Sequence, residues 1–125
     1  MRVFKVKEFH KWANKTGLTD KDLFDSALEV ADKNVEASLG KKVFKKRIAI
    51  EGEGKRGGAR TIVAFQEGNN LIYMYGFRKN KSANIKPKLL KELQMVAEVL
   101  LRFTDAELNK AVKNDILFEV KQDER

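Results

Sequence analysis

The chain has 125 residues, of which 42% are hydrophobic and 35% charged, and this composition predicts one globular domain over residues 1–125 and excludes a disordered protein. It has no cysteine and a single histidine, which excludes disulfides, thiolate chemistry and multi-histidine metal sites. No apolar run approaches the ~20 residues that span a bilayer, so we expect a cytoplasmic protein without membrane contact. The net charge of +8 falls entirely within residues 41–81, where 11 Lys and Arg outnumber three Asp and Glu. One-signed charge of this kind attracts polyanions, above all nucleic acid.

Residues 1–40 are predicted to form a strand followed by two helices. A weak alternation of charged and apolar residues is replaced by helical spacing, and Thr19 with Asp22 has the pattern of an N-terminal cap. The expected elements are a short edge strand at 2–6, a helix from Lys7 to Gly17, a second helix from Thr19 to about Lys33, and a loop that contains Gly40.

Residues 41–81 change to a period of two, which predicts a basic antiparallel sheet. Phe44, Ile48 and Ile50 fall on one side of the first strand, and Lys46 interrupts that side, so we expect Lys46 near a strand edge. Turn-forming residues alone separate the second strand from the third, as in a hairpin. The expected strands are 42–50, 60–66 and 71–78.

Residues 82–125 are predicted to be mainly helical. Pro87 suits a first helical position, and Thr104 with Glu107 forms the pattern of a capping box that opens a last short helix. Residues 116–120 have the composition of a further strand. The whole chain is therefore expected to have an α+β fold, with the strand and helical hairpin of 1–40, the sheet of 41–81 and the C-terminal helices of 82–125.

A glycine-rich loop at 52–57 matches the G-x-G-x-x-G pattern of dinucleotide-binding proteins. That pattern requires a helix directly after the loop, whereas the next segment is β-branched and aromatic and reads as a strand. We therefore expect a loop that presents Lys55 and Arg56 to a phosphate backbone, with a plain hairpin loop as the alternative.

The aromatic residues are expected to divide between core and surface. His10 has no second histidine to work with, and it and Trp12 are interpreted as structural. Tyr73, Tyr75 and Phe77 are expected to share one strand face, with Tyr73 in the core. The other two either pack as well or stack on nucleotide bases.

Cationic side chains are expected to converge on the sheet. Lys45 and Arg47 share one face of their strand, and Arg60 and Arg78 are candidates to join them from neighbouring strands. Solvated sheet faces usually mix charges, because like charges side by side are unfavourable. The cluster would stabilise negative charge, and because clustered cations weaken one another's hold on a proton, a lysine within it is a candidate general base.

Three segments, 44–50 (FKKRIAI), 54–65 (GKRGGARTIVAF) and 75–85 (YGFRKNKSANI), resemble the RelE/HigB family of toxins from type II toxin–antitoxin systems. The resemblance covers about residues 2–103, and the final helix is similar to an extension in a phage- and plasmid-associated branch. It implies a RelE-like fold and ribosome-dependent cleavage of messenger RNA in the A site, by attack of a ribose 2′-hydroxyl on the adjacent phosphate. It implies that no metal or cofactor is needed. We expect a helix-turn-helix antitoxin as partner and a monomer when the antitoxin is absent, although the sequence does not reveal the oligomeric state.

The resemblance also implies which residues act. The tyrosine that the family carries after the last strand is absent, its place being near Asn84. Basic site residues of the family match Lys45, Arg47, Arg60 and either Arg78 or Lys79. On this basis we predict the catalytic residues Lys45, Arg47, Lys55, Arg60 and Arg78, with Lys45 or Lys55 as the general base. The predicted RNA-binding residues are Lys42, Lys46, Arg56, Tyr75, Phe77, Lys79, Asn80 and Lys81. Two alternatives stay open: a toxin of the same fold without nuclease activity, such as a gyrase-directed ParE-like toxin, and a non-enzymatic RNA- or DNA-binding module.

Overall fold

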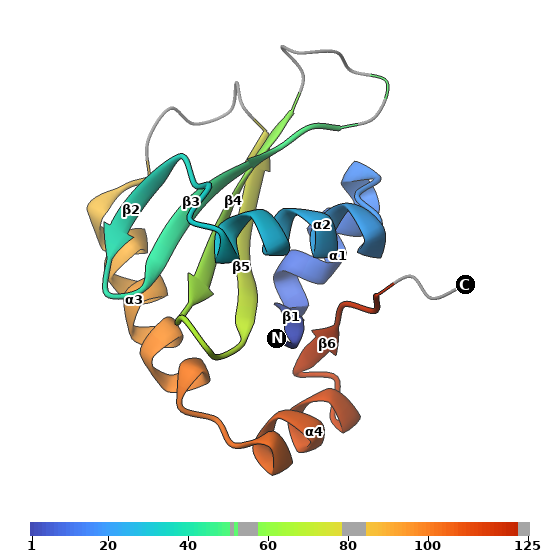
Figure 1. Ribbon diagram of the computed structural model, residues 1–125, viewed down its shortest axis with the longest axis vertical. Helices are drawn as coiled ribbons and strands as arrows, with labels where there is room; N and C mark the ends of the chain where they lie inside the picture. The colour runs from blue at the N-terminus through green and yellow to red at the C-terminus, as the bar shows by residue number, and fades with distance from the viewer. Residues whose placement is uncertain (51, 53–57, 79–84, 123–125) are drawn as a thin grey trace.

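The computed structural model describes residues 1–50, 52, 58–78 and 85–122, which form a mixed sheet with helices on both faces (Figure 1). The fold is of the α+β class, as the sequence predicted. In chain order the elements are β1 (Val3–Val6), α1 (Lys7–Thr16), α2 (Asp20–Ala31), β2 (Ala37–Gly40), β3 (Val43–Ile48), β4 (Ala59–Phe65), β5 (Leu71–Arg78), α3 (Pro87–Leu101), α4 (Asp105–Lys113) and β6 (Leu117–Glu119).

Local sequence signals account for most of these boundaries. Thr19 and Thr104 each accept a hydrogen bond from the third helical N–H, and Asp22 and Glu107 return one, so both capping boxes are present. Gly17 ends α1 with φ +89°, a left-handed conformation that glycine adopts without a steric penalty. These caps satisfy backbone groups that a helix end leaves without partners.

The six described strands are ordered β2-β3-β4-β5-β1-β6. Strands β3, β4 and β5 form the predicted antiparallel meander, and β6 is the strand predicted at 116–120. The prediction of an N-terminal edge strand is wrong, because β1 lies inside the sheet, parallel to β5 and antiparallel to β6. Its Val3 packs in the core on one face and its Phe4 in the core on the other, both with no exposed surface, as expected for an internal strand.

Strand β2 replaces the loop expected around Gly40. It pairs with β3 at the edge of the sheet, and a two-residue turn of Lys41 and Lys42 joins the two strands. Both lysines have positive φ, of 55° and 67°, as the tightest hairpin turns require. The sequence does not reveal this turn, because such positions usually hold asparagine or glycine.

Each face of the sheet packs against a pair of helices (Figure 1). Helices α1 and α2 contribute Phe9 and Leu23 to one core, which we call the α1/α2 face. Helices α3 and α4 contribute Leu93 and Leu108 to the other, the α3 face. Within the described part of the chain, no helix is both long and apolar enough to span a bilayer.

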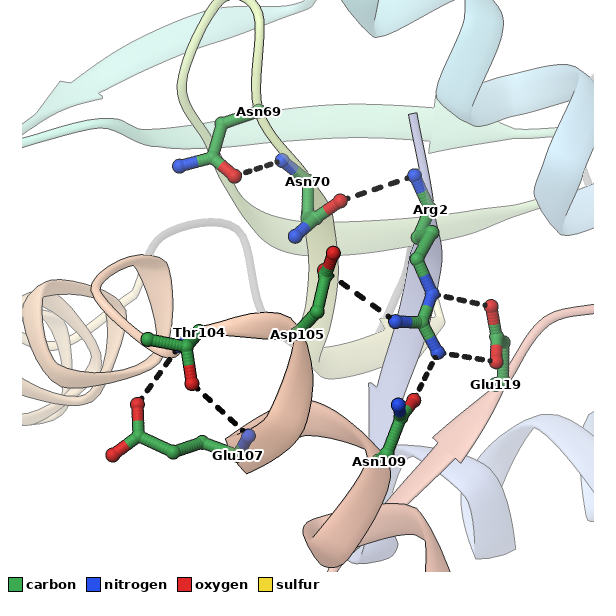
Figure 2. A network of polar contacts seen from close by, with 8 residues as sticks. All are labelled: Arg2, Asn69, Asn70, Thr104, Asp105, Glu107, Asn109 and Glu119. Carbon is green, nitrogen blue, oxygen red and sulfur yellow. Dashed lines mark hydrogen bonds and ion pairs between the residues drawn. The ribbon is translucent and has the colours of Figure 1, made fainter.

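The two ends of the described chain are joined by Arg2. Its guanidinium donates to both carboxylate oxygens of Glu119, at 3.0 and 2.9 Å, and to Asn109 Oδ1 at 2.9 Å (Figure 2). Its backbone N–H donates to Asn70 Oδ1 at 3.1 Å. A charge-assisted pair that uses two oxygens fixes orientation as well as adding energy, so this network holds β6 and α4 against β1.

Candidate functional site

Three basic side chains lie on the α3 face of β3 and β4. Arg47 and Arg60 are direct partners across the two strands, and Lys45, two residues before Arg47, is opposite Ile62. Residues opposite one another share a face, with Cβ atoms about 5 Å apart. Ile62 packs in the core of the α3 face, which fixes the side of the sheet on which all of them lie.

The same face includes one exposed aromatic ring. Tyr75 is opposite Ile62 on β5 and thus lies in line with Lys45 across three strands. It is 37% exposed, Arg47 is exposed and Lys45 is half-buried. The four residues Lys45, Arg47, Arg60 and Tyr75 form what we call the cationic face, a surface with positive charge and one ring available for stacking.

Arg60 is a largely buried member of the cationic face. Its side chain is 12% exposed, and its Nε donates to Glu36 Oε1 at 2.8 Å. The Nη1 atom of Arg60 is buried and has no hydrogen-bond partner among the residues that the structure describes. Sequence reasoning missed Glu36, because nothing in the local pattern connects a residue before β2 with one in β4.

Arg78 lies on the other side of the sheet. It is the partner of Ala59, one position from Arg60, so its side chain starts from the α1/α2 face. Because successive residues of a strand point to opposite faces, Arg60 and Arg78 cannot both begin on the α3 face. Lys45, Arg47 and Arg60 therefore share one face of the sheet, as expected. Arg78 does not join them, because the register places it on the opposite face.

A β-bulge separates the aromatic residues of β5. The pairing shifts between Ile62 and Val63, so Tyr73 faces the α1/α2 core while Phe77 packs in the α3 core. The expectation that Tyr73, Tyr75 and Phe77 share a face is thus wrong, because one extra residue in a bulge reverses the alternation. Tyr73 is fully buried, as predicted, and burial raises the pKa of its hydroxyl. Phe77 is 6% exposed, which leaves Tyr75 as the ring that a base could reach.

The expectation that Lys46 lies near a strand edge is wrong. It lies in β3, which is inside the sheet, and its side chain makes structural contacts. It is 6% exposed, and its Nζ contacts Glu29 Oε1 at 2.8 Å and donates to the Asn34 carbonyl at 2.9 Å. These partners tie β3 to α2 and to the segment after it. A lysine so covered is unsuited to bind RNA, whereas Lys42 is exposed in the turn between β2 and β3.

The remaining predicted site residues, Lys55, Arg56, Lys79, Asn80 and Lys81, lie outside the described residues, as does Asn84. The segment that follows the glycine-rich loop is strand β4, so the helix that a dinucleotide site needs is not there.

His10 has a structural role, as expected. Its ring stacks on that of Phe118, with centroids 3.9 Å apart and planes 2° from parallel. Burial, and then the charge of Lys5, lower the pKa of His10. In the ranges that the structure describes, no three His, Asp or Glu residues come together as a metal-ligand set.

Comparison with protein families identifies the chain. A family model described as the RelE toxin of the RelE/RelB toxin–antitoxin system matches residues 1–120. No curated protein matches the chain.

Proposed function

The chain belongs to the RelE family of toxins, which pair with antitoxins and are generally endoribonucleases, and we propose that it cleaves messenger RNA bound to the ribosome. The observation that carries this proposal is the cationic face, in which Arg47 and Arg60 are cross-strand partners with Lys45 beside them. Like charges opposite one another are unfavourable in a sheet. Glu36 pairs with Arg60 through Nε alone, and an RNA phosphate would lower this repulsion further, because it has the required charge and hydrogen-bond acceptors.

The reaction that fits these groups is an internal transfer of the phosphate. The ribose 2′-oxygen bonds to phosphorus while the bond from phosphorus to the 5′-oxygen breaks, which gives a 2′,3′-cyclic phosphate and a 5′-hydroxyl. Lys45 is proposed to accept the 2′-hydroxyl proton, and the leaving 5′-oxygen takes up a proton from water. Negative charge grows on the phosphate oxygens in the transition state, where Arg60 is proposed to stabilise it.

Two other members of the cationic face are proposed to hold the substrate. Arg47 is exposed and would bind a phosphate next to the one that is cleaved. Tyr75 would stack on a base, an interaction that tolerates any sequence. In other enzymes, the loss of one hydrogen-bond donor that stabilises the transition state lowers the rate by ~10²–10³. We expect Arg60→Ala to have an effect of this size.

Primer extension on ribosome-bound messenger RNA tests the proposal. The wild-type protein should give cuts at a fixed position within codons, and Arg60→Ala and Lys45→Ala should lose them. Lys110→Ala is the matched control, because it removes one charge from the exposed side of α4. Full cleavage by a folded Arg60→Ala variant would disprove the assignment.

The same experiment separates the alternatives. A gyrase-directed toxin would leave the transcripts intact and change DNA supercoiling. A binding module would retain RNA with a strong salt dependence and yield no product. The proposed partner is a helix-turn-helix antitoxin whose acidic side chains cover the basic strands, since opposite potentials favour such contacts.

A further inference from the structure

Glu36 and Arg60 form an ion pair that crosses a strand. Glu36 directly precedes β2 and Arg60 lies in β4, so the pair reaches across β3, which lies between them in the sheet. The backbone N–H of Glu36 donates to the Lys45 carbonyl at 2.8 Å, which fixes the position of the glutamate on β3. The backbone of Glu36 is thus held by the same strand that carries Lys45 and Arg47.

The contact uses only one side of the guanidinium. Glu36 Oε1 lies 2.8 Å from Nε of Arg60, while Nη1 is buried and has no hydrogen-bond partner within the described part of the chain. An arginine has five N–H donors, so a carboxylate at Nε leaves others for a second acceptor. A buried donor without an acceptor is unfavourable, and a phosphate oxygen from bound RNA would supply one.

A second ion pair shows what a purely structural contact looks like in this protein. Lys46 and Glu29 also meet at 2.8 Å, on the other face of β3, and the lysine has a further acceptor in the Asn34 carbonyl. None of the Lys46 side-chain atoms is among the buried unpartnered atoms of the described residues. The two pairs thus differ in that only the cation on the cationic face keeps an unused buried donor.

We infer that Glu36 is a positioning residue for Arg60: it holds the guanidinium through Nε, so that the Nη groups are directed to the phosphate that is cleaved. The inference rests on the proposed ribonuclease function. Without the carboxylate, Arg47 repels Arg60 from across the strand pair, and Arg60 loses its fixed orientation. A reacting group that is misplaced slows the chemical step more than it weakens binding.

Single-turnover cleavage of ribosome-bound messenger RNA tests this inference with Glu36→Gln, which keeps the size of the side chain. The rate constant at saturation should fall about 10- to 100-fold, while the protein concentration at half-saturation changes less than about threefold. Glu29→Gln is the control: it removes an ion pair of the same length and should leave the rate constant unchanged.

A double-mutant cycle tests whether Glu36 acts through Arg60. In the Arg60→Ala background, Glu36→Gln should cause no further loss, because the carboxylate acts through the arginine. Independent, multiplying losses would overturn the inference, as would a wild-type rate for Glu36→Gln when Arg60→Ala is slow. A wild-type rate for Arg60→Ala would instead overturn the proposed function itself. Thermal unfolding of each variant confirms that folded proteins are compared.

Discussion

The indole ring of Trp12 lies so close to Gly76 that a Cβ at position 76 would overlap ring carbons Cζ3, Cε3 and Cη2. Gly76 is in the middle of β5, where a glycine otherwise weakens a strand. Its role is to let α1 approach the sheet. This contact lies on the α1/α2 face, behind the strands that carry the cationic face.

Gly76→Ala should therefore destabilise the protein by about 1–3 kcal/mol, the usual cost of overpacking. Urea unfolding measures this loss. Gly58→Ala is a suitable control, because a Cβ there would be 3.4 Å from its nearest neighbour, the Ile48 carbonyl oxygen. Equal stability of the Gly76→Ala variant and the wild type would contradict the packing described.

Tyr73→Phe should change how stability depends on pH. The Tyr73 hydroxyl donates to the Leu23 carbonyl at 2.6 Å, and its loss should cost about 1 kcal/mol at pH 7. Burial raises the pKa of Tyr73 in the folded protein, whereas an unfolded tyrosine ionises near pH ~10. The folded state then binds more protons, so the stability from this group is present below pH ~10 and is lost as pH rises further.

The gap in unfolding free energy between the wild type and Tyr73→Phe should consequently shrink or reverse at about pH 11. Unfolding by urea at the two pH values measures it. Tyr75→Phe is the control, because this ring is at the surface and its loss should affect stability little at either pH. A gap of constant size would show that Tyr73 ionises equally in both states.

Glu119→Gln should remove an acid-sensitive part of the stability. Hydrogen bonds from Arg2 lower the pKa of Glu119, so its contribution is present above the unfolded value near pH ~4.3 and is lost as pH falls through the lower folded value. The two side chains are 32% and 30% exposed, and we expect about 1 kcal/mol at pH 7 after allowing for solvent screening.

Thermal unfolding from pH 7 down to pH 3 checks the Glu119 prediction, since wild type and Glu119→Gln should converge at the acid end. Glu98→Gln removes a surface pair with Arg102 and should have no measurable effect. The account of the Arg2 network is wrong if Glu119→Gln and Glu98→Gln behave alike.

Lys46→Ala separates a structural lysine from one that binds RNA. The change should lower stability by about 1–2 kcal/mol, because the Asn34 carbonyl loses a donor and Glu29 its partner. RNA affinity measured against salt concentration should keep its slope, whereas Arg47→Ala should reduce the slope by about one phosphate contact. A reduced slope for Lys46→Ala would restore the lysine to the RNA-binding set.

Sequence patterns predicted the helices and the meander well because their signals are local. The Thr19 and Thr104 caps, Gly17 and Pro87 each act within one helical turn. The position of β1 was mispredicted because its parallel pairing with β5 joins residues almost 70 positions apart. Strand β2 was missed because its alternation covers only four residues and ends in a glycine, which is too short a pattern to indicate a strand.

The candidate site was predicted only in part, for a similar reason. Alternation within β3 correctly puts Lys45 and Arg47 on one face, and the pairing of β3 with β4 in the predicted meander adds Arg60. The face on which Arg78 lies depends on the strand register, and the faces of Tyr73 and Tyr75 depend on the β-bulge. The residue pattern specifies neither the register nor the bulge. Glu36 could be found only in three dimensions.

The most direct test of the cationic face is the yield of 2′,3′-cyclic phosphate ends on ribosome-bound messenger RNA. The variant Arg47→Ala/Arg60→Ala is compared with Lys110→Ala/Lys113→Ala, which removes equal charge from exposed positions of α4. We predict that the arginine variant yields no product above background while the lysine variant matches the wild type. Equal yields from the two folded variants would contradict the account.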